Sequence, residues 1–146
     1  MLRNRESGGS PSSKGSDEYT VLIAEDDETL CKLYARTFSS WKLPIKVVSV
    51  NNGMEAMVMV ERLRPSLLIL DLGMPRMNGF EMIKLIRSKS EFNYIDIVVI
   101  TGLDKREIDK KGGVPPAVAI FPKPVPWQQV KGFVQAALSR RELAGK

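Results

Sequence analysis

The segment 66–81, "SLLILDLGMPRMNGFE", decides the fold class. Four consecutive apolar residues, 67–70, lead directly into Asp71. A continuous apolar run of this length is typical of a strand that is buried on both faces, as in a parallel sheet covered by helices. A stretch rich in glycine and proline follows, and a new apolar pattern begins at Phe80. The segment therefore predicts a central strand whose carboxyl end carries a carboxylate.

The rest of the chain alternates short apolar runs with helically spaced segments. Residues 80–86 and 130–137 show the helical spacing, whereas 103–111 is short and polar. Repeated strand–helix units predict an α/β fold, a doubly wound five-stranded parallel sheet with five helices. The predicted strands are 20–24, 46–50, 67–70, 97–100 and 118–121. The clearest helical stripe is formed by Leu30, Leu33, Tyr34, Thr37, Phe38 and Trp41.

Length and composition favour one cytoplasmic domain. The 146 residues suit a single domain, and a hydrophobic fraction of 43% is ordinary for a globular protein. No apolar run approaches the roughly 20 residues that span a bilayer, and no signal-peptide pattern is present. Cys31 is the only cysteine, so an intrachain disulfide is impossible. We expect a cytoplasmic protein that does not contact membranes.

The charge distribution gives no sign of nucleic-acid binding. The net charge of +5 is partly carried by the N-terminal residues, and no helix-turn-helix, zinc-finger or aromatic RNA-binding motif accompanies it. Residues 1–17 are rich in serine, glycine and basic residues, so we expect a disordered leader there. The folded domain is expected over 18–141, with a flexible tail at 142–146.

Polar side chains follow several of the predicted strands. Glu25 and Asp26 follow the first strand, Asp71 the third, Thr101 the fourth and Lys123 the fifth. Ligands of open parallel sheets bind at the carboxyl ends of the strands. If these four strands are neighbours, their side chains converge in one crevice. Taken singly, each has an ordinary explanation as a turn, cap or surface residue, and only the joint arrangement favours a site.

The residue types in this crevice suit phosphoryl transfer to a carboxylate. Crowded carboxylates are tolerated around a divalent cation, and the absence of histidine favours an ion that binds oxygen, Mg²⁺ or alternatively Mn²⁺. An aspartate can attack phosphorus to form an aspartyl phosphate. The metal, the Lys123 ammonium and the Thr101 hydroxyl then supply the charge and donors that the phosphoryl oxygens require.

Four stretches together resemble the receiver domain of two-component response regulators, of the chemotaxis-regulator-like superfamily. The likeness extends over roughly residues 18–140, and its most specific part is the pattern D-x-x-M-P-x-M-x-G that begins at Asp71. The four stretches are "LIAEDDE" (22–28), "LLILDLGMPRMNGFE" (67–81), "VVITG" (98–102) and "FPKP" (121–124). The resemblance implies a flavodoxin-like strand order 2-1-3-4-5, with two helices on one face and three on the other.

The resemblance also implies a role for each site residue. Asp71 matches the phosphoacceptor, phosphorylated from the phosphohistidine of a sensor histidine kinase or of a histidine phosphotransfer protein. The change would be read by a partner or a fused output domain, and the chain would catalyse only its own phosphorylation and dephosphorylation. The implied Mg²⁺ ligands are Glu25, Asp26, Asp71 and the backbone carbonyl of Gly73. Thr101 and Lys123 match the phosphoryl-binding switch residues, and Pro124 the proline of a cis peptide bond.

One departure from the family pattern concerns signal readout. The position three residues before Lys123 is usually aromatic, and here it is Ile120. We hypothesise that activation is reported by a different repacking of the face around the fourth helix and fifth strand. The chain alone does not decide between a stand-alone receiver and one taken from a longer regulator or hybrid kinase.

Two other functions are weighed against this one. A pseudo-receiver, an interaction module that is never phosphorylated, is disfavoured by the complete set of site residues. A phosphohydrolase of the haloacid dehalogenase type would require a second aspartate two residues after Asp71, and that position is Gly73.

Overall fold

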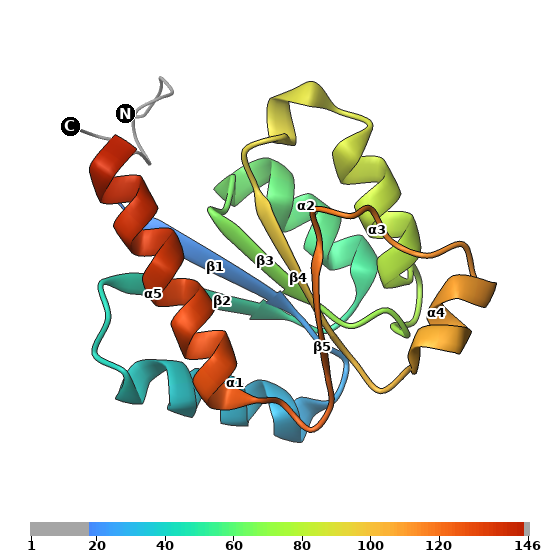
Figure 1. The fold of residues 1–146 in the computed structure, drawn as a ribbon, viewed down its shortest axis with the longest axis horizontal. Coiled ribbons are helices and arrows are strands. Elements are labelled where there is room, and N and C mark those ends of the chain that lie inside the picture. Colours follow the sequence, from blue (N-terminus) through green and yellow to red (C-terminus); the bar gives the residue numbers. More distant parts are fainter. Residues whose placement is uncertain (1–17, 145–146) are drawn as a thin grey trace.

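The computed structural model describes residues 18–144 and contains a five-stranded parallel sheet (Figure 1). The spatial order of the strands is β2-β1-β3-β4-β5, which confirms the flavodoxin-like order and the doubly wound α/β fold class. The strands are β1 (Tyr19–Ala24), β2 (Ile45–Val50), β3 (Leu67–Leu70), β4 (Asp96–Thr101) and β5 (Ala119–Pro122).

Helices cover both faces of this sheet. Figure 1 shows α1 and α5 on one face and α2, α3 and α4 on the other. The helices are α1 (Glu28–Ser40), α2 (Gly53–Leu63), α3 (Gly79–Arg87), α4 (Lys105–Lys110) and α5 (Trp127–Ala144), with a short 3₁₀ helix, η2 (Ser90–Phe92). The leader predicted at 1–17 lies outside the described residues. Helix α5 continues to Ala144, within the segment 142–146 that was expected to be a tail.

Burial along the strands follows their positions in the sheet. Every residue of β1 and of β3 is buried, as the apolar run 67–70 predicted for a strand covered on both sides. The strands β2 and β5 form the two edges. Exposure alternates along β5, and in β2 only Val50 is fully buried. The register Leu70–Ala24 and Leu70–Val99 aligns the carboxyl ends of β1, β3 and β4, so that the residues after them share one edge.

The sheet separates two hydrophobic cores of different composition. The core under α1 and α5 contains tyrosine, phenylalanine and tryptophan side chains, whereas that under α2, α3 and α4 is mainly aliphatic and methionine-rich. The first core includes Tyr19, Tyr34, Phe38, Trp41, Trp127 and Phe133. The second includes Met57, Met59, Met74, Met82, Ile83 and Ile108.

The sequence also explains where the helices begin and end. Asp27 caps α1 by accepting a hydrogen bond from the Leu30 N–H at 3.2 Å, a role for which aspartate is well suited. The polar segment 103–111 forms only the six residues of α4. Gly112 and Gly113, with φ of 104° and 72°, end this helix in a conformation that favours glycine.

Candidate functional site

Three carboxylates meet at the carboxyl edge of the sheet. Glu25 and Asp26 follow β1, and Asp71 follows β3. One oxygen of each lies within 4.8 Å of the others, close enough to bind one cation together. Glu25 is buried, Asp71 is partly buried and Asp26 is exposed, so the cluster opens to solvent on one side. The predicted convergence of these residues is therefore present.

Lys123 joins the cluster from β5. Its Nζ lies 2.9 Å from an Asp71 oxygen and 3.1 Å from a Glu25 oxygen. The backbone N–H of Lys123, the residue directly after β5, donates to the Thr101 carbonyl at 2.9 Å. This hydrogen bond continues the pairing of β5 with β4 and holds the Lys123 backbone at the edge of the sheet. The peptide bond between Lys123 and Pro124 is cis. The ammonium group thus lies between two carboxylates on different strands.

The surroundings shift the ionisation of two of these groups. Burial raises the pKa of Glu25, and this effect exceeds the opposing effects of the hydrogen bond from Asp27 and of the nearby Lys123. For Lys123, burial alone would lower the pKa, but the hydrogen bonds to Asp71 and Glu25 raise it overall. Lys123 therefore stays protonated at neutral pH and partly neutralises the cluster.

Backbone and side-chain contacts from α1 hold Glu25 in place. The Asp27 N–H donates to a Glu25 carboxylate oxygen at 3.0 Å. The Cys31 thiol lies 3.1 Å from the Glu25 carbonyl oxygen. This contact of Cys31 could not be predicted, because a cysteine one helical turn into α1 carries no sequence pattern that connects it with the preceding strand.

The loop after Asp71 depends on a glycine that sequence reasoning did not select. The Gly79 N–H donates to the Leu72 carbonyl at 3.0 Å, which brings the start of α3 against the loop. A Cβ at Gly79 would lie 2.6 Å from the Asp71 carbonyl oxygen, closer than packing allows. The last position of the D-x-x-M-P-x-M-x-G pattern is thus glycine for a steric reason. Gly73 also contributes, since its N–H donates to an Asp71 oxygen at 3.3 Å.

Thr101 is the last residue of β4, and its hydroxyl group bonds to a residue outside the carboxylate cluster. It is 1% exposed, and its hydroxyl oxygen accepts a hydrogen bond from the Leu103 N–H at 3.3 Å. Ile120, the residue at the usual aromatic position, lies on the edge strand β5 opposite Val99 and is 42% exposed. The structure therefore gathers Glu25, Asp26, Asp71 and Lys123 in one cluster. The Thr101 hydroxyl and the Ile120 side chain take no part in these contacts.

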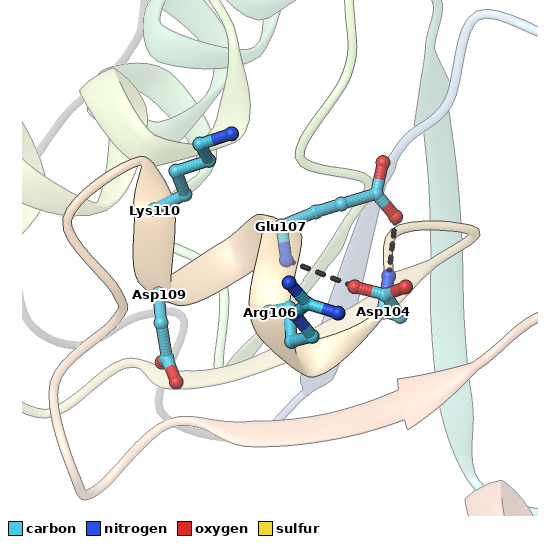
Figure 2. Close-up of a pocket in the computed structure, with 5 residues that line it drawn as sticks. All are labelled: Asp104, Arg106, Glu107, Asp109 and Lys110. Atoms are coloured by element: carbon cyan, nitrogen blue, oxygen red, sulfur yellow. Dashed lines mark hydrogen bonds between the residues drawn. The ribbon is translucent and has the colours of Figure 1, made fainter.

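A separate hollow of about 610 Å³ around α4 does not coincide with the carboxylate cluster (Figure 2). Figure 2 shows the capping box in which the Asp104 side chain accepts from the Glu107 N–H while Glu107 accepts from the Asp104 N–H, each at 2.9 Å. Asp109 pairs with Lys105 on the helix surface. These groups stabilise a short helix and form no catalytic arrangement.

The strand order and the carboxylate cluster are those expected of a receiver domain of two-component signalling. Residues 21–135 match the sequence profile of the response regulator receiver domain family. The chain belongs to this family.

Individual relatives and solved structures agree. Response regulator MprA of Mycobacterium leprae is 30% identical over 82% of this chain, and the chain spans 51% of that protein. The polar-differentiation response regulator DivK of Brucella anthropi is 27% identical over 56% of this chain and 65% of its own length. The crystal structure of the signal receiver domain of a putative Luxo repressor protein from Vibrio parahaemolyticus is similar with a TM-score of 0.71 and 25% identity. That similarity covers 88% of this chain and 95% of the other.

The chain thus spans about half the length of MprA and about two thirds of that of DivK. Within residues 18–144, no helix combines the length and the apolar character that crossing a membrane requires.

Proposed function

We propose that Asp71 is the phosphoacceptor of this receiver domain and that Mg²⁺ is its cofactor. The observation that carries the proposal is the cluster itself: oxygens of Glu25, Asp26 and Asp71 lie within 4.8 Å of one another, and Lys123 contacts Asp71 at 2.9 Å. The donors are all carboxylate oxygens, which suits Mg²⁺ or Mn²⁺ better than a soft metal. The Gly73 carbonyl is proposed as a further ligand, two residues after Asp71.

The bound cation would supply positive charge to the phosphoryl oxygens during transfer. An Asp71 carboxylate oxygen attacks phosphorus, a P–O bond forms, and the P–N bond to the donor histidine breaks as its ring nitrogen takes the electron pair. Lys123, already hydrogen-bonded to one Asp71 oxygen, follows the transferred group and neutralises part of its charge. The chain then catalyses only its own phosphorylation and dephosphorylation.

Thr101 is proposed as the residue that senses the phosphoryl group. Its hydroxyl now accepts from the Leu103 N–H, and a phosphoryl oxygen at Asp71 would offer it a stronger, charged acceptor to which it could donate. Movement of Thr101 would displace the start of α4, which begins at Lys105. A partner or fused output domain would then bind the altered face.

Readout of this change is proposed to occur without a rotating aromatic side chain. Ile120 is half-exposed on the edge strand β5, and a branched aliphatic side chain there can repack with its neighbours but has no ring to bury. Amide chemical shifts with and without a beryllofluoride mimic would test this. Shifts over α4 and β5 support the hypothesis, and an unchanged α4–β5 face contradicts it.

The proposed donor is a sensor histidine kinase or a histidine phosphotransfer protein, which the chain would meet in the cytoplasm. Support comes from the match of residues 21–135 to the response regulator receiver domain family.

Acetyl phosphate with Mg²⁺ provides a direct test of the phosphoacceptor. Intact-mass spectrometry should show the gain of one phosphoryl group by the unmodified chain, and no gain after removal of the metal with a chelator. Asp71→Asn should abolish the gain, whereas Asp109→Asn, a matched substitution on the surface of α4, should leave it intact. No gain in the unmodified chain would favour a pseudo-receiver, and sustained turnover of p-nitrophenyl phosphate would favour a phosphohydrolase.

A further inference from the structure

A groove of about 650 Å³ lies between α3 and the loop that follows α4, outside the carboxylate cluster. It exists because α4 ends after six residues, and the chain then turns away through Gly112 and Gly113. The side chains that matter below are Phe80, Ile83 and Lys84 from α3, and Lys111, Val114 and Pro115 from the loop. A volume of this size accommodates a small molecule or a few residues of a bound peptide.

The floor of the groove is apolar. Ile83 is buried in the core under α3, and Phe80 and Val114 pack against that core while remaining partly exposed. Pro115 extends the apolar surface toward the loop. An aliphatic or aromatic side chain inserted here would remove apolar area from water on both partners, which favours binding.

The rim of the groove carries an excess of positive charge. Lys84 and Lys111 are both exposed, and neither ammonium group makes an ion pair or hydrogen bond with any residue in 18–144. Arg87 is held differently, because its guanidinium donates to the Phe92 and Ile95 carbonyls at 3.2 and 2.7 Å. The single lining carboxylate, Glu81, accepts a hydrogen bond from the Asn78 N–H at the start of α3.

This distribution differs from that of the hollow around α4. There, acidic and basic side chains are mixed, and Figure 2 shows the Asp104 and Glu107 side chains hydrogen-bonded to each other's backbone N–H. In the groove, Lys84 and Lys111 lie on opposite walls, and neither side chain pairs with a carboxylate of residues 18–144. The contrast indicates a surface suited to a ligand that brings both negative charge and an apolar group.

We propose that the groove is a docking site for an acidic segment of a partner protein, which inserts one apolar side chain over Phe80 and Val114 and pairs its carboxylates with Lys84 and Lys111. The N-terminal segment of this chain does not fit, because residues 1–16 carry Arg3, Arg5 and Lys14 against Glu6 alone. A second copy of the chain, with a net charge of +5, is disfavoured for the same reason. Binding of the acidic segment does not require Asp71 to be phosphorylated.

The test uses the full chain, labelled with ¹⁵N, and a capped synthetic peptide in which one leucine is flanked on both sides by aspartates and glutamates. We expect the peptide to shift the amide signals of Phe80, Lys84 and residues 111–114. Replacing its leucine by serine, or its acidic residues by lysines, should each abolish the shifts. Binding of the serine peptide with equal affinity would reduce the interaction to charge attraction and overturn the proposal.

Charge-reversal variants locate the site. The double variant Lys84→Glu/Lys111→Glu should weaken peptide binding by at least about tenfold, because it replaces two attractions by two repulsions. The matched variant Lys42→Glu/Lys46→Glu changes the net charge equally, on and beside the β2 edge, and should weaken binding by less than about twofold. Circular dichroism and thermal melts verify that both variants are folded.

Three results would overturn the proposal: no amide shifts in the groove, shifts centred elsewhere, or equal losses in the two double variants. A single-stranded oligonucleotide that shifts the groove amides while the acidic peptide does not would also overturn it, in favour of nucleic-acid binding.

Discussion

The two faces of the sheet are packed with different types of side chain. Under α1 and α5, aromatic rings contact one another edge to face, with centroid distances of 5.9 Å for Tyr34–Phe38 and 5.3 Å for Tyr34–Trp127. Under α2, α3 and α4, the core consists mainly of aliphatic and methionine side chains, which adapt more easily to altered shapes. The helices differ as well, since α5 has 18 residues and α4 has six.

This difference divides the functional site into two parts. Glu25 and Lys123 precede α1 and α5, the helices on the aromatic face, whereas Thr101 precedes α4. Ile108 is the one buried residue of α4, so little apolar area holds that helix to the sheet. Glu25 and Lys123 are thus attached to the firmly packed face. Asp71, which precedes α3, and the proposed sensing hydroxyl of Thr101 are attached to the face that carries the lightly anchored α4.

The largest effect is expected from a truncation on the aromatic face. Tyr34→Ala removes a ring that contacts both Phe38 and Trp127, and should lower the free energy of unfolding by about 3–5 kcal/mol. Urea denaturation with an unchanged m-value would measure this. Tyr34→Phe keeps the ring contacts and serves as the control. A loss below about 1 kcal/mol for Tyr34→Ala would contradict the rigidity assigned to this face.

A truncation in α4 should have a more local effect. Ile108→Ala removes the side chain that attaches α4 to the core, and should speed amide hydrogen exchange in α4 by at least about tenfold while leaving exchange in α5 unchanged. Hydrogen–deuterium exchange mass spectrometry resolves the two helices. If α4 and α5 responded equally, the two faces would behave as one cooperative unit, and the distinction would be lost.

Neutralising the Glu25 carboxylate should change the stability of the protein in a pH-dependent way. Its pKa is raised above the ordinary glutamate value of 4.5, chiefly by burial, so the folded state holds this proton to higher pH than the unfolded chain does. The contribution of this group to stability is therefore greatest below that value and falls as pH rises through the folded pKa. Glu25→Gln removes this loss and should raise the free energy of unfolding at pH 7 by about 1 kcal/mol.

The difference between Glu25→Gln and the unmodified chain, measured by urea denaturation from pH 4 to pH 8, should grow with pH. Asp109→Asn, on the surface of α4, is the control. A variant less stable than the unmodified chain at pH 7 would show that the ion pair with Lys123 outweighs the burial of the Glu25 carboxylate.

The smallest effect concerns a hydroxyl on the aromatic face. Among residues 18–144, the buried Tyr19 hydroxyl has no hydrogen-bond partner, so Tyr19→Phe should be neutral or raise the unfolding free energy by up to about 1 kcal/mol at pH 7. Burial, with the charge of Asp96, raises the pKa of Tyr19 to about 12. The stability due to this group is present below pH 10 and lost as pH rises through the folded pKa.

Tyr19→Phe should therefore lose less stability than the unmodified chain between pH 10 and pH 12, which thermal melts in that range would show. Its ring keeps the contact with Arg141, which lies 5.6 Å from the Tyr19 ring centroid. Identical pH profiles for the two proteins would mean that the Tyr19 hydroxyl reaches solvent before unfolding.

Much of the fold could be predicted because the spacing of apolar residues follows from which side chains are buried. The run 67–70 identified the central strand, and the strand ends located Glu25, Asp26, Asp71 and Lys123. What could not be predicted depends on contacts between distant backbone segments. The pattern does not reveal that Gly79 permits α3 to approach the Asp71 carbonyl, nor that the Thr101 hydroxyl binds the Leu103 N–H. The groove was also missed, because it results from the shortness of α4 rather than from any motif.

The edge-to-face contact between Tyr34 and Trp127 has a practical consequence. The chain contains two tryptophans, and Trp127 lies four residues after Lys123 with its ring on a tyrosine of α1. Any rearrangement of the Lys123 loop should alter the polarity around this indole and its energy transfer from Tyr34. The substitution Trp41→Phe removes the emission of the other tryptophan. The fluorescence spectrum of Trp127 can then report metal addition and phosphorylation in real time, without an attached dye.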